Sequence, residues 1–209
     1  MPKETFFNLP QEKRDAICKT AVAEFAAHPY KQASINHIIA QAGIAKGSFY
    51  QYFENKKDLY LYLLQIIGEA KLKYLAPALQ NPEQNDFFTL LRDIYRAGIQ
   101  FAIKNPQYTE IGKKLLASKD DPILADIIEA NMPAAQNFFA PLLQQAINRG
   151  EVRADIDIDM FAYMIAAMHT HIVEYHIEHV SSKYDEHMMT TLDQFIEFLR
   201  HGIGVERNP

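Results

Sequence analysis

Apolar side chains recur at steps of three and four residues along nearly the whole chain, and no run alternates apolar and polar residues. This spacing gathers apolar side chains on one face of an α-helix, whereas a half-buried strand would need a period of two. With 48% apolar residues among 209, the chain is no disordered tail. Its length suits one large domain, or a small module joined to a larger one. We expect an all-α protein.

Caps and helix breakers divide this pattern into segments. Ser34 and Asn55 are expected N-caps, and Gly43 is the expected end of the helix that Ser34 begins. Pro133 and Pro141 are expected to kink or split the helix in which they lie. The expected helices span residues 11–28, 34–43, 45–52, 56–79, 86–104, 107–118, 121–149, 157–180 and 185–201.

Several classes of protein are disfavoured by composition. The longest apolar stretch, 59–67, is interrupted by Gln65 and is far shorter than the roughly 20 residues of a membrane span. Lys3 and Glu4 precede only a short apolar patch, which is not typical of a signal peptide. The single Cys18 excludes an intrachain disulfide and favours a reducing compartment. We expect a cytoplasmic protein that does not associate with membranes.

Charge is unevenly distributed. Residues 1–58 hold eight Lys/Arg and six Asp/Glu, a net charge of +2. The remainder of the chain has a net charge of −7, which gives −5 for the whole chain. A locally basic segment on an acidic body suits a polyanionic partner, although random variation in surface charge is the alternative.

Residues 34–57 form the most informative block, SINHIIAQAGIAKGSFYQYFENKK. Two short helices joined by a turn that contains glycine make a helix-turn-helix. The outward positions of its second helix are predicted to be Lys46, Gly47, Ser48, Tyr50, Gln51 and Tyr52. Gln can read adenine, Ser can bond a base or a phosphate, and Gly lets the backbone approach closely. The alternative is a protein-interaction module in which Tyr50 and Tyr52 are core aromatics.

The run from Gly43 to Phe53, followed by Asn55-Lys56-Lys57-Asp58-Leu59, resembles the signature of the TetR family of bacterial transcriptional repressors. The resemblance covers residues 10–60. It implies a homodimer with a three-helix DNA-binding module at residues 1–55 and an effector-binding and dimerisation core at 56–209, in which helix 56–79 links the two. A small, largely apolar effector would release such a repressor from a palindromic duplex operator.

The resemblance also implies roles for single residues. Ser34 and Asn36 would meet DNA from the first motif helix, while Lys46, Gly47, Ser48 and Gln51 would face bases. Tyr50, Tyr52 and Lys56 would hold phosphates. The family usually has Ala four residues before the turn glycine, where this chain has Ile39, so the helix contact either widens or moves to Ala40.

Two further regions suit the remaining functions. Aromatic residues in 60–149 suggest an effector pocket lined by Tyr95, Phe101, Asn137 and Phe138, although such rings also simply fill cores. Apolar steps in the last two helices suggest a four-helix dimer interface, with an ordinary monomer core as the alternative. Its expected residues are Phe161, Ile165, Met168, Ile172, Met188, Leu192, Phe195 and Leu199.

Other chemistry has weaker support. His169, His171, His176 and His179, with Glu174 and Glu178, could hold a metal, but structural histidines are the more common finding, so we expect no metal and no cofactor. Nucleotide-binding, hydrolase and metalloprotease motifs are absent, and Cys18 is a poor nucleophile candidate. We expect no enzyme. The rival to a ligand-responsive, sequence-specific regulator is a helical adaptor without DNA binding.

Overall fold

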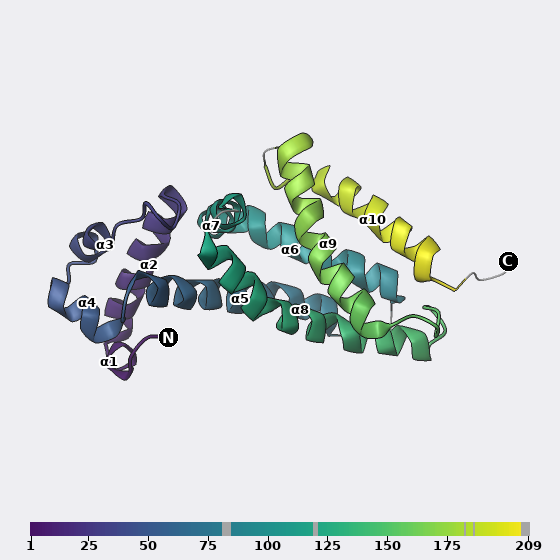
Figure 1. Cartoon of the computed structure of the whole chain (residues 1–209), viewed down its shortest axis with the longest axis horizontal. Helices are drawn as coiled ribbons and strands as arrows, with labels where there is room; N and C mark the ends of the chain where they lie inside the picture. Colours follow the sequence, from purple (N-terminus) through teal and green to yellow (C-terminus); the bar gives the residue numbers. More distant parts are fainter. Residues whose placement is uncertain (81–84, 119–120, 182, 186, 206–209) are drawn as a thin grey trace. The chain divides into compact units, whose positions relative to one another are not determined.

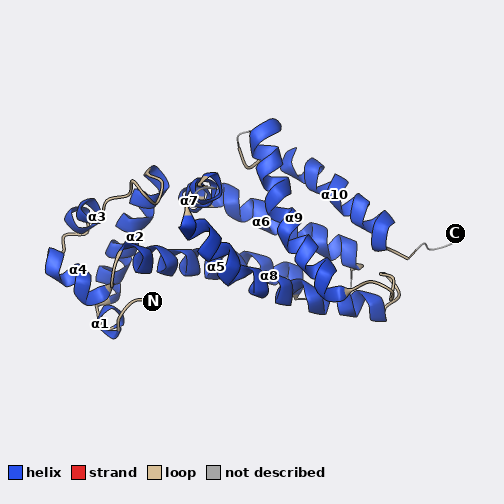
Figure 2. Ribbon diagram, viewed as in Figure 1, coloured by secondary structure: helices blue, strands red, loops and turns tan. Residues whose placement is uncertain are grey.

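The computed structural model describes residues 1–80, 85–118, 121–181, 183–185 and 187–205, and throughout these ranges the secondary structure is α-helical (Figures 1 and 2). The only extended pairing in them is an isolated bridge between Val152 and Gly204. The prediction of an all-α protein is confirmed. The helices are α1 (Glu4–Phe7), α2 (Gln11–Ala27), α3 (Ile35–Gln41), α4 (Lys46–Tyr52), α5 (Lys56–Leu79), α6 (Phe87–Lys104), α7 (Pro106–Ala117), α8 (Pro122–Asn148), α9 (Ile158–His179) and α10 (His187–Ile203).

The helix ends follow the local signals in the sequence. The Ser34 hydroxyl accepts a hydrogen bond from His37 N, and the Asn55 side chain accepts one from Asp58 N at 3.0 Å. Gly43 has a φ of +63°, a conformation that costs glycine little because it lacks a Cβ. Of the kink or split expected at Pro133 and Pro141, the split does not occur: α8 runs continuously through both residues, and both are exposed. On an exposed face, the carbonyls that a proline leaves without a donor can bind water.

The chain forms two compact units. The first comprises Met1–Lys73 and Asn105–Lys119, and the second comprises Tyr74–Lys104 and Asp120–Pro209. In the first unit, α2 packs against both α3 and α7, so α7 joins the helices of the motif although it lies far along the chain. The predicted division into a DNA-binding domain (1–55) and an effector-binding and dimerisation domain (56–209) concerns function and stays a prediction.

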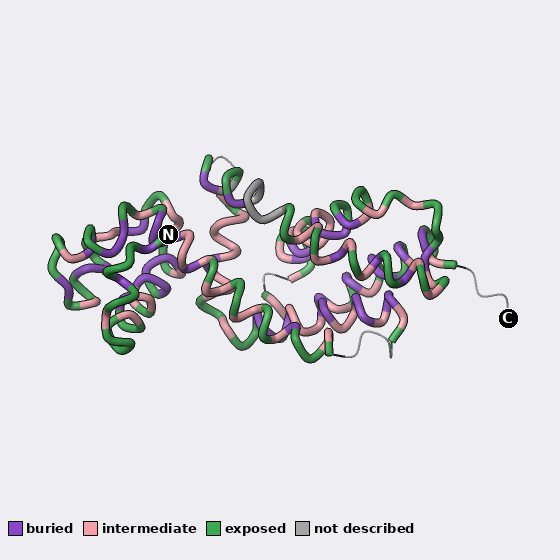
Figure 3. Tube along the Cα trace, turned by 90° about the horizontal axis from the view of Figure 1, so that it is seen from below, coloured by how far each residue is buried: buried purple, intermediate pink, exposed green. Residues whose placement is uncertain are grey.

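The core of the first unit holds the helix-turn-helix together. Its fully buried side chains come from α1, α2, α3, α4, α5 and α7 and from Phe53, which directly follows α4, and Figure 3 shows buried and exposed residues alternating along the chain. They include Phe6, Ile17, Ile38, Phe49, Phe53 and Leu59. Ile39 is buried whereas Ala40 is exposed, so the contact between the motif helices does not move to Ala40.

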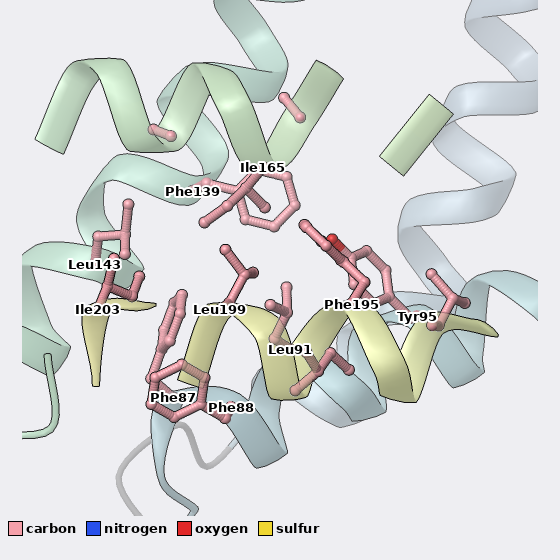
Figure 4. Close-up of a cluster of buried hydrophobic side chains, with 14 of the residues drawn as sticks. Phe87, Phe88, Leu91, Tyr95, Phe139, Leu143, Ile165, Phe195, Leu199 and Ile203 are labelled. Atoms are coloured by element: carbon pink, nitrogen blue, oxygen red, sulfur yellow. The ribbon is translucent and has the colours of Figure 1, made fainter. Parts of the chain in front are cut away.

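The core of the second unit is built from α6, α8, α9 and α10. Phe87, Leu91, Leu143 and Ile165 are almost completely buried in it, and Figure 4 shows their side chains converging from α6, α8 and α9. A smaller cluster joins Leu75 of α5 to α6. Among the described residues, no helix is long and apolar enough to cross a membrane.

Candidate DNA-binding site

The second motif helix, α4, presents a polar face to solvent. Lys46, Gly47 and Gln51 are exposed, Ser48 is half-buried, and the Tyr50 side chain is 48% exposed. Phe49 on the opposite face is fully buried, which fixes the rotation of the helix about its axis. The outward placement expected for these five residues therefore agrees with their exposure, while their contacts to DNA stay a prediction.

The outward placement expected for Tyr52 was wrong. This side chain is only 7% exposed, and its ring lies 6.3 Å from the ring of Phe6. Residues three apart share a helix face, so Tyr52 lies on the same side of α4 as the buried Phe49. Its ring belongs to the core that supports α4.

Gly47 has no steric role among the residues that the structure describes. A Cβ at this position would meet none of their atoms within 4 Å, and its φ is not positive. Glycine is disfavoured inside helices relative to alanine, so the fold alone gives no reason for glycine at this position. Close approach of another molecule to the α4 backbone would explain it.

A buried carboxylate holds the start of α3. Glu24 of α2 is 5% exposed; its Oε1 accepts a hydrogen bond from Ser34 N at 2.7 Å, and its Oε2 lies within hydrogen-bond distance of His37 Nδ1. Burial by itself would raise the pKa of Glu24, but these hydrogen bonds and the nearby histidines His37 and His28 outweigh burial and lower it. The carboxylate stays ionised and orients the first turn of α3, where Asn36 is exposed as expected.

Lys56 has a structural role that the sequence did not indicate. Its ammonium donates to the carbonyl oxygens of Lys31 and Ala33 at 3.1 and 3.0 Å, and it lies 4.8 Å from the centre of the Tyr30 ring. These contacts hold the loop that leads into α3. The phosphate contact expected of Lys56 is not tested by them and stays a prediction.

The two motif helices and the turn between them contain no acidic residue. No Asp or Glu occurs between Phe25 and Phe53, a stretch that contains Lys31 and Lys46. The carboxylate just before it, Glu24, is buried and hydrogen-bonded. Phosphates approaching α3 and α4 would therefore meet no exposed carboxylate from this stretch. This stretch without acidic residues indicates the DNA-facing surface more specifically than the difference in net charge between the two parts of the chain.

Comparisons with known proteins identify the fold. Residues 17–63 match the family model described as bacterial regulatory proteins, tetR family. The crystal structure of a TetR family transcriptional regulator from Chloroflexus aurantiacus J-10-FL is 36% identical, with 99% of this chain and 100% of that chain covered and a TM-score of 0.69. The chain belongs to the TetR family.

Other relatives of this TetR-family chain are named as repressors. The probable acrEF/envCD operon repressor of Escherichia coli (strain K12) is 28% identical over 168 residues, which cover 77% of this chain and 74% of that protein. The HTH-type transcriptional repressor BepR of Brucella suis is 25% identical over 163 residues, 75% and 77% of the two chains. The chain is a DNA-binding transcriptional regulator.

The residues expected to line an effector pocket in this TetR-family regulator have different environments. Tyr95 is 3% exposed, its ring stacks on that of His169 with ring centres 5.0 Å apart, and its hydroxyl has no hydrogen-bond partner among the described residues. Phe101 is buried against Tyr74 at 5.3 Å, and the half-buried Phe138 packs against both clusters of the second unit. Asn137, by contrast, is exposed, so it does not lie with these residues in the core, and its role in a pocket stays a prediction.

The expected dimer interface was wrong for the five of its eight residues that are buried in the core of their own chain, and for the other three it stays a prediction. Its residues form the core within one chain, because the apolar faces of α9 and α10 pack against α8 and α6 (Figure 4). The fully or largely buried members are Ile165, Met188, Leu192, Phe195 and Leu199. Phe161, Met168 and Ile172 are partly buried against the same core.

The histidines of α9 do not converge on one point. His176 is fully buried with Nδ1 3.0 Å from Thr191 Oγ1, whereas the exposed His171 pairs with Glu174 on the surface. Among the described residues, no three His, Cys, Asp or Glu side chains are grouped as metal ligands.

In the first unit, burial raises the pKa of Cys18 to about 11, and Asp15 adds to the effect, so its thiolate is disfavoured at neutral pH.

Proposed function

We propose that the chain is a homodimeric repressor that reads a palindromic operator with α4 and is released by a small, largely apolar effector. The exposed side of α4 carries this proposal. It offers Lys46, Ser48 and Gln51 around a glycine that the fold itself does not require. Gln and Ser suit base edges, and Lys46 and Tyr50 suit phosphates or bases.

The ends of the motif support the same assignment. Ser34 caps α3 and Asn36 lies in its first turn, so both side chains would meet DNA from the start of this helix. Lys56 would add positive charge behind this turn. Repression is supported by relatives, since the Escherichia coli and Brucella suis proteins are both named as repressors. Such a regulator would act on DNA in the cytoplasm.

Effector binding is assigned to the second unit, close to Tyr95. A buried hydroxyl without a partner costs free energy, and a bound molecule that accepts a hydrogen bond would remove that cost. Burial raises the pKa of Tyr95, so this group is a neutral donor. The surrounding Phe195 and Phe139 are apolar, which suits an apolar compound with one polar group.

Dimerisation is assigned to the exposed side of α9. Met160, Tyr163, Met164 and Tyr175 are 48, 50, 37 and 56% exposed, although they are large and apolar or aromatic. Met164 and Tyr175 are about three helical turns apart and so share one face. Phe198 on α10, 65% exposed, is a further candidate. A two-fold pair would place two copies of α4 at half-sites about 34–36 Å apart.

Selection of bound duplexes from a random pool tests the central claim. The expected result is a palindromic site whose half-sites are centred one helical turn apart. Recovery of duplexes without a shared sequence would reject sequence-specific reading by α4. Recovery of a single unrepeated half-site would reject the dimer.

A further inference from the structure

The recognition helix α4 has only seven residues, from Lys46 to Tyr52. Isolated helices this short are unstable in water, and the last four carbonyl groups of any helix lack intrahelical donors. In α4, the carbonyl of Phe49 accepts a hydrogen bond from Phe53 N at 2.9 Å. The carbonyls of Tyr50, Gln51 and Tyr52 need donors from elsewhere.

Residues 3–5 supply all three donors. Lys3 Nζ donates to the carbonyl oxygen of Tyr50 at 2.8 Å, and Lys3 N donates to that of Tyr52 at 2.8 Å. Between them, Thr5 Oγ1 donates to the carbonyl oxygen of Gln51. The ammonium of Lys3 also lies at the negative end of the helix dipole. Three consecutive carbonyls of α4 are therefore capped by a segment more than 40 residues earlier in the chain.

Phe6 fixes this segment to the core. Its side chain is fully buried, and its ring lies 4.9 Å from that of Phe53 and 5.4 Å from that of Tyr62. Tyr62 belongs to α5. The segment thus joins the carbonyl end of α4 to the long helix that follows it.

We propose that residues 3–6 form a clasp that holds the recognition helix in its DNA-binding conformation, with Lys3 and Thr5 as positioning residues. This inference rests on the proposed reading of DNA by α4. Without the clasp, the last turn of α4 frays, and Gln51 loses its fixed orientation. Ordering that turn on the operator then opposes binding, so affinity falls for every sequence.

A clasp differs from a direct phosphate contact in its salt dependence. Removing a lysine that neutralises a phosphate flattens the slope of log K against log salt by about one unit. Removing a lysine that only caps α4 lowers affinity and leaves this slope unchanged. Thr5 allows a second test that changes no charge. Thr5→Val removes the hydroxyl donor at nearly constant side-chain shape, and Thr5→Ser keeps the hydroxyl.

The test uses the full chain and the duplex selected by the wild-type protein. Amide hydrogen exchange of α4 is measured in the free protein, and operator affinity is measured at several salt concentrations. Lys3→Ala and Thr5→Val are each expected to speed exchange in the last turn of α4 and to weaken binding by about 3- to 10-fold, with the salt slope kept. Thr5→Ser should restore both, and Lys13→Ala, at an exposed lysine of α2, should leave α4 exchange unchanged.

Unchanged exchange in α4 in both Lys3→Ala and Thr5→Val would overturn the clasp, as would faster exchange with full operator affinity. A flattened salt slope in Lys3→Ala with unchanged exchange would reassign Lys3 to a phosphate. If the wild-type chain selected no duplex at all, the DNA-reading proposal would fail, whereas exchange in the free protein would still show whether residues 3–5 cap α4.

Discussion

Gly47→Ala is expected to stabilise the protein and to weaken its binding to DNA. The substitution adds a methyl group to an exposed position of α4 where no atom of the described residues lies within 4 Å, so no clash with them opposes it. Alanine is favoured over glycine in a helix by about 0.5–1 kcal/mol. In a chain of this size, that gain corresponds to a rise in melting temperature of about 1–4 °C.

The effect on binding should have the opposite sign. If the α4 backbone approaches base edges or phosphates at Gly47, the added methyl separates the surfaces and disturbs the neighbouring contacts of Lys46 and Ser48. We expect operator affinity to fall at least tenfold, about 1.4 kcal/mol. Thermal unfolding of the free protein and fluorescence anisotropy with a labelled operator measure the two effects on the same sample.

Gly68→Ala is the matched control. Gly68 is also exposed and helical, nothing lies within 4 Å of its virtual Cβ, and it belongs to α5 outside the motif. It should raise the melting temperature by a similar amount and leave operator affinity in the absence of effector unchanged. If Gly47→Ala bound the operator as tightly as the wild type, close backbone approach at this position would be refuted.

Four other changes test separate parts of the proposal. Gln51→Ala should relax base preference at one position of each half-site in a repeated duplex selection; an unchanged consensus would exclude base reading by Gln51. Because the pKa of Glu24 lies below its ordinary 4.5, its stabilisation is present above that pH and is lost as pH falls. Glu24→Gln should therefore lower the free energy of unfolding by about 1–3 kcal/mol at pH 7, as measured by urea titration. The difference in unfolding free energy from the wild type should become smaller below pH 4.5, and a difference that stayed constant with pH would contradict this. Tyr95→Phe should keep or raise apo stability by up to about 1 kcal/mol and should abolish thermal shifts caused by alcohols, phenols or fatty acids that stabilise the wild type; retained shifts would move the effector elsewhere. Tyr163→Glu should give monomers in sedimentation experiments, while Leu72→Glu, at a residue 54% exposed on α5, should not; a dimeric Tyr163→Glu would exclude this face of α9.

Local chemistry made the helix ends predictable. Ser34 and Asn55 can cap a helix because their side chains accept from backbone N–H groups two or three residues later. Gly43 can take a positive φ without a Cβ clash. These signals depend on neighbouring residues only, and so did the resemblance that identified the motif.

Long-range partners were not predictable in this way. The spacing of Ile165 and Leu192 shows that a helix face is buried, but it is the same whether that face meets its own chain or a second copy. Nothing near Lys3 or Lys56 in the sequence indicates which carbonyls they reach. Tyr52 is different, since its distance of three residues from Phe49 already placed it on the buried face of α4.

Two positions at which the free protein forgoes stability coincide with two of its proposed binding sites. Gly47 lies in a helix where alanine would fit, and the Tyr95 hydroxyl is buried without a partner. A sequence selected only to fold would avoid both, because each has a simple substitution that removes the cost. Close approach of operator DNA at Gly47, and a hydrogen bond from Tyr95 to an effector, would each offset that cost on binding. Local inconsistency of this kind is expected at functional sites, and here it separates α4 and α6 from the many helical positions whose residues the fold alone explains.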